Sequence, residues 1–381
     1  MSSRNHSTDA VEREFVGLPS PTQPQAGHGT HPCQGVYWRP KGQRPRIAFI
    51  ATHYNVDYAE HYLAPYLAER GYGFLGWNTR YRGAEDAFVL EHALIDIGVG
   101  VRWLKEEAGA EQIIVLGNSG GASLMGTYQA QALALDLNLN GAGSTDKVRD
   151  ALESLDAGDF YVSVNSHPGR ADVLTTWLDP SVLDETDPVP TDPSLDMFHP
   201  DNKPPYSDAF QKRYRQAQRD RNDRISDWAT AELERLRAAQ IPDRVFPLFR
   251  VWADLRFMDP AIDPSDRPCP HCYAGDPARA NRMPMNLGRA NMLRSWLAMW
   301  SLRESVVRVH LQLPKVDNPS LVVQGTSDSG CFPSDARAIF DALGGEDKAI
   351  EMIPGAHYFE DAPESRDRVS DLLADWVRSK A

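Results

Sequence analysis

Short apolar runs alternate with longer amphipathic segments in two parts of the chain, 33–170 and 316–381. The runs have the length of buried strands, and the segments between them carry apolar residues at helical spacing. This alternation is typical of an α/β protein with a mostly parallel sheet and helices on both faces. The expected strands are 33–40, 46–53, 73–78, 112–119, 161–166, 320–325 and 349–354, and the expected helices are 56–70, 87–107, 121–133, 365–379 and one after Pro333.

The alternation stops between these two parts. Residues 171–315 hold many Pro and Asp residues, with a charged helix expected near 207–240 and an apolar, Trp-containing helix near 290–304. Such an interruption indicates an inserted second subdomain, which is reasonable for a chain of this length. We therefore predict three parts, which are a disordered tail at 1–10, a core domain made of 11–170 and 316–381, and a mainly helical cap at 171–315.

Composition narrows the classes of function. The 381 residues are 41% hydrophobic and 24% charged, an ordinary globular balance. The net charge of -13 argues against nucleic-acid binding, because phosphate backbones attract Lys and Arg. No apolar run reaches the roughly 18 residues of a membrane helix, and the polar N-terminus lacks the apolar core of a signal peptide. The four Cys do not form the pattern of a secreted disulfide framework. We expect a cytoplasmic protein with neither a membrane nor a nucleic-acid partner.

A candidate nucleophile lies between an expected strand and an expected helix. Gly117-Asn118-Ser119-Gly120-Gly121 fits the pattern G-x-S-x-G. A sharp turn in this setting holds the serine in a strained backbone conformation with its hydroxyl exposed, and small neighbours let the two backbones pass closely. The helix N-terminus also offers N–H groups to a developing oxyanion. The alternative, a Gly/Ser turn without chemistry, is disfavoured by the strand-to-helix setting.

A serine nucleophile needs a base, and the base needs an acid that orients it. Asp328 follows the expected strand 320–325, and His357 follows the next apolar run. Parallel strands place their carboxyl ends at one edge of a sheet, so both residues should lie near Ser119. Four other acids compete for this role. Asp335 and Asp341 lie on the helix expected after Pro333, which leads away from that edge. Glu360 and Asp361 follow His357 too closely in the chain to reach around its ring.

These motifs resemble those of the α/β-hydrolase superfamily, in which a G-x-S-x-G turn is followed by an acid and then by a histidine before a final helix. The segments that carry the resemblance are Gly117–Gly121, Gly325-Thr326-Ser327-Asp328 and Gly355-Ala356-His357. Asn78-Thr79-Arg80-Tyr81-Arg82-Gly83 resembles the family's Asp-x-Arg-Gly turn. The resemblance covers roughly 33–170 and 316–381, and it implies Ser119 as nucleophile, His357 as base and Asp328 as acid.

The resemblance also implies an oxyanion hole. Ala51-Thr52-His53-Tyr54-Asn55 looks like the family's His-Gly-x turn, which supplies a backbone N–H beside that of Gly120. Tyr54 stands where Gly is usual, so the second donor is the N–H of either Tyr54 or Asn55.

Weaker signals come from a cysteine pair and an aromatic stripe. Cys269-Pro270-His271-Cys272 has CxxC spacing, but a structural zinc wants four ligands and a redox pair wants a strand-to-helix setting, so we expect a loop and no metal. The stripe from Met292 to Trp300 forms either cap core, which we favour, or a wall that faces substrate. The candidate pocket residues are His53, Asn118, Trp296 and Trp300.

The sequence thus predicts a serine hydrolase that cleaves a carboxylic ester through an acyl-enzyme and without a cofactor. The Trp, Met and Phe residues of the cap suggest a fairly apolar, small-molecule substrate. The same triad can serve an amide, a lactone or a C–C bond next to a carbonyl, because fold does not choose the bond. A non-catalytic binding protein of the same fold is a second alternative, but it would be expected to lack a triad member.

Overall fold

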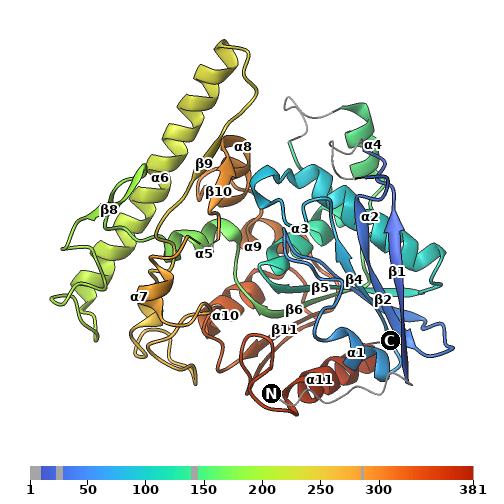
Figure 1. The fold of residues 1–381 in the computed structure, drawn as a ribbon. Coiled ribbons are helices and arrows are strands. Elements are labelled where there is room, and N and C mark those ends of the chain that lie inside the picture. Colours follow the sequence, from blue (N-terminus) through green and yellow to red (C-terminus); the bar gives the residue numbers. More distant parts are fainter. Residues whose placement is uncertain (1–9, 23–28, 139–144, 285–286, 381) are drawn as a thin grey trace.

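The computed structural model describes residues 10–22, 29–138, 145–284 and 287–380. At its centre lies an eight-stranded sheet in the order β1-β2-β4-β3-β5-β6-β11-β12 (Figure 1). The two contacts that β2 makes are antiparallel, and the other neighbouring strands are parallel. The strands are β1 (Val11–Leu18), β2 (Cys33–Pro40), β3 (Ile47–Ala51), β4 (Gly73–Asn78), β5 (Gln112–Ser119), β6 (Phe160–Ser166), β11 (Ser320–Gly325) and β12 (Lys348–Ile353). The predicted, mostly parallel sheet is confirmed.

Helices cover both faces of the sheet because its strands are apolar on both sides. In β3, Phe49 and Ala51 pack toward one face and Ala48 and Ile50 toward the other. Two helices, α1 (Ala64–Glu69) and α11 (Ser365–Lys380), cover the first face, at the bottom of Figure 1. The opposite face carries α2 (Leu90–Glu106), α3 (Gly121–Leu133) and α10 (Pro333–Ala342), and α4 (Asp146–Glu153) packs on α2.

The segment between β6 and β11 lies to one side of the sheet, and its α6 projects beyond the rest of the molecule (Figure 1). It has one long helix, of 31 residues, and two small antiparallel ribbons. Its elements are α5 (Arg170–Trp177), β7 (Val182–Asp184), β8 (Asp187–Thr191), α6 (Asp208–Ala238), β9 (Val245–Pro247), α7 (Pro277–Ala280), β10 (Ala290–Met292), α8 (Leu293–Ser295), a π-helical turn (Trp296–Trp300) and α9 (Val309–Gln312), with 3-10 turns at Leu255–Phe257 and Leu313–Lys315.

This segment shares a core with the sheet. Trp177, Ile225 and Trp296 belong to the same apolar cluster as Trp77 of β4 and Leu94 of α2. Burying such side chains together stabilises the contact by about 25 cal/mol per Å² of apolar surface. The division into a core and a cap at 171–315 stays a prediction, as does the tail, of which residues 1–9 lie outside the described residues.

Two helices were predicted wrongly, and one strand of the central sheet was not predicted. The helix expected at 56–70 begins only at Ala64, because side-chain hydrogen bonds hold the preceding chain in turns. Asn78 Oδ1 accepts the N–H of Tyr58 at 2.8 Å, and Asp57 Oδ1 accepts that of Ala59 at 2.9 Å. Such bonds compete with a helical backbone. The strand that was missed, β1, is an edge strand with an exposed charged centre.

The apolar helix expected at 290–304 is broken into shorter pieces. Residues 290–292 pair with β9 as a ribbon, and the helical turns that follow end at Trp300. Tertiary contacts decide this outcome, since Trp296 donates its indole N–H to Ser226 Oγ of α6 at 3.1 Å. The charged helix expected near 207–240 is present as α6.

Candidate active site

The turn from β5 to α3 holds Ser119 in a conformation that non-glycine residues rarely adopt. Ser119 ends β5 with φ of 55°, and α3 begins at Gly121. A Cβ on Gly117 would lie 2.2 Å from Ala122 Cα, and one on Gly121 would lie 2.3 Å from the carbonyl oxygen of Thr52. Both glycines are therefore required for the close passage of strand and helix, and strain of this kind is typical of functional turns.

Asp328 and His357 form a buried pair at the same sheet edge. His357 Nδ1 lies 2.8 Å from Asp328 Oδ2, and the two side chains are 8% and 0% exposed. The other carboxylate oxygen accepts the backbone N–H groups of Gly330 at 2.7 Å and Cys331 at 3.0 Å. Because this loop holds the carboxylate in place, Asp328 is positioned to accept a hydrogen bond from a protonated Nδ1 of His357.

Electrostatics favour a positive charge on His357. Burial lowers the pKa of its imidazole, but the charge of Asp328 and the hydrogen bond to it outweigh burial, so the pKa is raised. The competing acids are engaged elsewhere or exposed. Asp335 accepts the Phe332 N–H at 2.9 Å, and Asp341 lies exposed on α10.

Asn165 joins the loops that carry the acid and the histidine, and sequence reasoning missed it. Its Oδ1 accepts the N–H of Gly325 at 2.6 Å, and its Nδ2 donates to the carbonyls of Ala356 at 3.0 Å and His357 at 2.9 Å. Asn165 has φ of 45°, a conformation that asparagine tolerates better than most residues. An Asn at the end of an apolar strand was the one signal available.

Ser119 and His357 line one cavity of about 340 Å³. Trp177 and Trp252 form its apolar wall, with stacked rings whose centroids are 4.7 Å apart, and the ring of Tyr273 lies 5.1 Å from that of His357. Both residues are described in the structure, and no hydrogen bond joins Ser119 Oγ to the imidazole of His357. Such contacts often tighten only when substrate binds.

The expected pocket residues divide into two groups. His53 and Gly120 line the cavity. Asn118 does not, because it is fully buried and braces the turn, with Nδ2 donating to the Val164 carbonyl at 2.8 Å. Trp296 and Trp300 are fully buried as well and lie outside the cavity lining, so placing them in the pocket was wrong and their interpretation as core was right. Trp177 and Trp252, which sequence reasoning did not single out, take that role.

The two residues considered for the second oxyanion N–H have different surroundings. The phenol of Tyr54 is buried and hydrogen-bonded to Ser123 Oγ at 2.9 Å. The N–H groups of Asn55 and Val56 both point to His53 Nδ1, at 3.5 and 3.4 Å. The loop after β3 therefore wraps around the ring of His53 beside Gly120.

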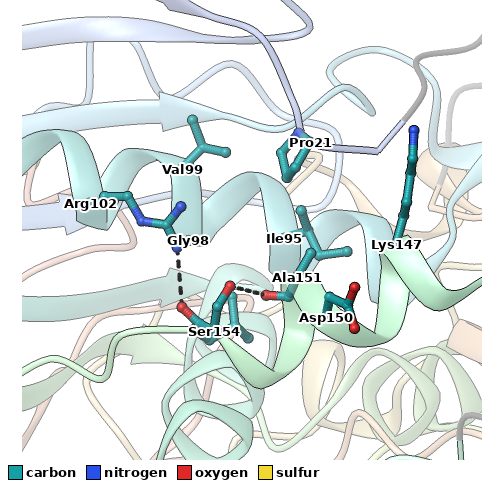
Figure 2. A pocket seen from close by; sticks show the side chains of 10 residues that line it. Pro21, Ile95, Gly98, Val99, Arg102, Lys147, Asp150, Ala151 and Ser154 are labelled. Atoms are coloured by element: carbon teal, nitrogen blue, oxygen red, sulfur yellow. Dashed lines mark hydrogen bonds between the residues drawn. The ribbon is translucent and has the colours of Figure 1, made fainter.

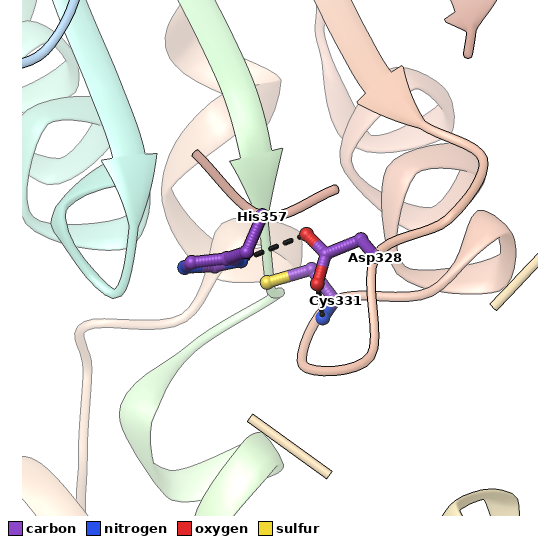
Figure 3. Close-up of side chains that lie close together, drawn as sticks. All are labelled: Asp328, Cys331 and His357. Carbon is purple, nitrogen blue, oxygen red and sulfur yellow. Dashed lines mark hydrogen bonds and ion pairs between the residues drawn. The ribbon is translucent and has the colours of Figure 1, made fainter. Parts of the chain in front are cut away.

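A buried thiol lies next to the acid and the histidine. Potential metal-ligand atoms of Asp328, Cys331 and His357 lie within 4.8 Å of one another (Figure 3). Among the described residues, this is the one group of three or more His, Cys, Asp or Glu side chains that could hold a metal ion. Burial, and then the charge of Asp328, raise the pKa of Cys331 well above its usual value, so it stays a neutral thiol. Cys269 and Cys272 lie outside this group and carry free thiols.

A second cavity, of about 370 Å³, lies between α2 and α4 (Figure 2). Arg102 donates to the carbonyl of Ser154 at its edge, at 3.1 Å. Its lining contains no candidate for a nucleophile paired with a base, which separates it from the cavity at the strand ends.

Comparison with known proteins bears on the fold. No protein-family model matches the sequence, and no curated protein does. Among solved structures, the chain is similar to the alpha/beta hydrolase GrgF from Penicillium sp. sh18, with 13% identity, a TM-score of 0.51, and coverage of 97% of this chain and 98% of that chain. The chain has the α/β-hydrolase fold.

Two esterase structures match with lower TM-scores. The esterase domain of a Rhodothermus marinus protein is 11% identical, with a TM-score of 0.45 over 97% of this chain and 98% of that one. Brefeldin A esterase, a bacterial homologue of human hormone-sensitive lipase, is 12% identical, with a TM-score of 0.46 over 100% of this chain and 80% of that one. Among the described residues of this α/β-hydrolase fold, no helix has the length and apolarity to span a bilayer.

Proposed function

We propose that the protein is a carboxylic ester hydrolase with Ser119 as nucleophile, His357 as base and Asp328 as acid. The observation that carries this proposal is the cavity at the strand ends. It is lined by a serine in a strained turn and by a histidine whose Nδ1 is held 2.8 Å from a buried carboxylate. A strained nucleophile, a base and an orienting acid are the three parts that acyl transfer to serine requires.

In the proposed reaction, His357 Nε2 accepts the proton of the Ser119 hydroxyl as Oγ attacks the ester carbonyl. The tetrahedral intermediate collapses when the imidazolium protonates the leaving alcohol oxygen, and water, activated by the same histidine, then releases the acid. The N–H of Gly120, together with that of Tyr54 or Asn55, stabilises the oxyanion. Asp328 stabilises the imidazolium and remains ionised.

We further propose that residues 171–315 act as a cap that selects an aromatic or apolar substrate. Four lining residues support this assignment because they lie between β6 and β11 and are mostly aromatic; they are Trp177, Trp252, Tyr273 and Leu287. Aromatic walls bind flat or apolar groups through burial and ring stacking.

A fluorophosphonate probe tests the nucleophile directly. We expect wild-type protein to be labelled and to hydrolyse a short 4-nitrophenyl ester, and Ser119→Ala to lose both at an unchanged melting temperature. The loss of turnover should be about 10⁴-fold or more. Ser379→Ala, at an exposed position on α11, is the matched control. Labelling that persists in folded Ser119→Ala protein would exclude Ser119.

The bond type needs a panel of substrates. The same triad could cleave activated esters, anilides and β-diketones, which differ in the group that leaves. The relative kcat/KM for these substrates therefore separates ester, amide and C–C cleavage. A protein that reacts with the probe and turns over none of the panel would contradict the assignment as an ester hydrolase. A protein that does not react at all would be the binding-protein alternative.

A further inference from the structure

Arg170 is an almost fully buried arginine beside the proposed nucleophile. It is the first residue of α5, a few residues after the end of β6. It lines the cavity that holds Ser119, and its side chain is only 1% exposed. Its guanidinium lies between two aromatic rings, 4.6 Å from the centroid of Tyr54 and 4.8 Å from that of Trp300. Such stacking fixes the plane of the group before any ligand arrives.

Its two terminal nitrogens have partners. Arg170 Nη1 pairs with Glu85 Oε1 at 2.5 Å, while Nη2 donates to Asn55 Oδ1 at 3.2 Å and contacts His53 Nδ1 at 3.4 Å. The third nitrogen, Nε, is buried without an acceptor. A buried charged donor without a partner costs free energy that an incoming acceptor would recover.

The free Nε and the ring of His53 meet in front of Gly120. A Cβ on Gly120 would lie 2.8 Å from His53 Nε2, 3.1 Å from Arg170 Nε and 3.4 Å from His167 Nε2. Three N–H donors, of Asn55, Val56 and Arg170, approach Nδ1 of His53, so this nitrogen is the acceptor and Nε2 carries the proton. The region beside the nucleophile therefore presents N–H donors, and the missing side chain at position 120 leaves them room.

The balance of charge in the cavity also favours an anion. Among its described lining residues Arg170 is the one permanent cation, and none is Asp or Glu. Burial, and next the positive charge of Arg170, lower the pKa of His167 to about 3 and hold that of His53 well below its usual value. The charge of Arg170 is therefore felt in the cavity in spite of Glu85.

We propose that Arg170 and His53 form a carboxylate-binding subsite beside Ser119, so that the substrate is an ester whose acyl part carries a carboxylate. The leaving oxygen must stay next to His357, which protonates it, whereas Arg170 Nε lies against Gly120. A group bound by Arg170 therefore belongs to the acyl side. The kinetic test of this inference rests on the proposed ester hydrolysis. The binding test does not, because it measures carboxylate binding without turnover.

The kinetic test compares acyl groups of equal length with and without a carboxylate. We measure kcat/KM for the mono-4-nitrophenyl esters of succinic and glutaric acid against 4-nitrophenyl butyrate and valerate. Wild-type protein should prefer the anionic esters, and Arg170→Met should lower this preference about tenfold to one-hundredfold, the range of a hydrogen bond to a charged group.

Two variants guard against a trivial loss of folding. Arg170→Met leaves the half-buried carboxylate of Glu85 without its cationic partner. The double variant Glu85→Gln/Arg170→Met restores neutrality and should show the same loss of preference. Arg308→Met is the matched control because it removes a similar ion pair, to Asp172 on α5, outside the lining of the cavity. It should leave the preference unchanged.

The binding arm requires no turnover. Ser119→Ala should bind monomethyl glutarate more tightly than dimethyl glutarate in calorimetry, and Glu85→Gln/Arg170→Met in that background should abolish the difference. Equal losses for anionic and neutral esters, or equal binding of the two glutarates, would overturn the carboxylate subsite. A failure of fluorophosphonate labelling with carboxylate binding intact would instead overturn the proposed hydrolase alone.

Discussion

Asp328→Asn is the substitution for which the structure gives the most definite expectation. One oxygen of Asp328 accepts two backbone N–H groups, from Gly330 and Cys331, and the other accepts from His357 Nδ1. An asparagine at this position keeps its carbonyl oxygen toward the two backbone donors. Its NH₂ group then faces His357 and donates to Nδ1.

This reversal changes the tautomer of His357. When Nδ1 accepts a hydrogen bond, the proton of the neutral ring moves to Nε2, which can no longer take the proton of Ser119. The shape of the site is kept, so KM should change little while kcat falls. We expect a loss of about 10³–10⁴-fold, or about 4–5 kcal/mol of transition-state stabilisation.

The assay is hydrolysis of a short 4-nitrophenyl ester across pH, with a thermal melt on the same sample. Asp335→Asn is the matched control, since Asp335 is a mostly buried carboxylate in the first turn of α10 and faces Arg256 instead of His357. Near-normal turnover in Asp328→Asn, or a comparable loss in folded Asp335→Asn protein, would refute the assignment of the acid.

Three further expectations concern the same site. In wild-type protein, kcat/KM should rise with pH as His357 loses its proton. The midpoint should lie above about 6.5, because Asp328 raises the pKa of this histidine more than burial lowers it. A lower midpoint in the kinetic titration would contradict this expectation. Asn165→Ala should lower the free energy of unfolding by about 2–4 kcal/mol in a denaturant titration, together with kcat, because three buried hydrogen bonds and a favourable left-handed residue are lost. Trp252→Ala should change the ratio of kcat/KM between bulky and small acyl esters by about tenfold or more, whereas Trp296→Ala, in the core, should lower the melting temperature without changing that ratio. The reverse pattern would show that the wall of the cavity is misplaced.

Much of the sheet could be predicted from the sequence because its central strands are buried on both sides. Runs such as 112–119 and 320–325 read as strands without ambiguity, and both are strands with those bounds. Edge strand β1 was missed because its exposed middle lacks an apolar run. The helix expected at 56–70 failed for a different reason, since hydrogen bonds from Asn78, distant in sequence, hold its first half in turns.

The candidate site residues at the ends of strands could be found from the sequence pattern. The residues of the cavity wall could not, because their positions depend on tertiary folding. Ser119, Asp328 and His357 each follow a recognisable strand, so their approach to one edge could be expected. The positions of Trp177 and Trp252 depend on how the segment after β6 folds back over the sheet, which no local periodicity reports. The apolar residues around Trp296 are spaced as in a helix, and they are buried in the core.

The proposed chemistry and the proposed recognition share structural parts. Arg170 contacts Asn55 of the loop after β3, Glu85 after β4, and the ring of Trp300 in the segment between β6 and β11. The same guanidinium lies against Gly120, whose N–H is the expected oxyanion donor. A change in the segment between β6 and β11 that moves Trp300 therefore shifts Arg170, and with it the surroundings of the proposed oxyanion. Substitutions around Trp300 should then alter kcat together with KM, because the group proposed to recognise the substrate also packs against the turn that carries Ser119.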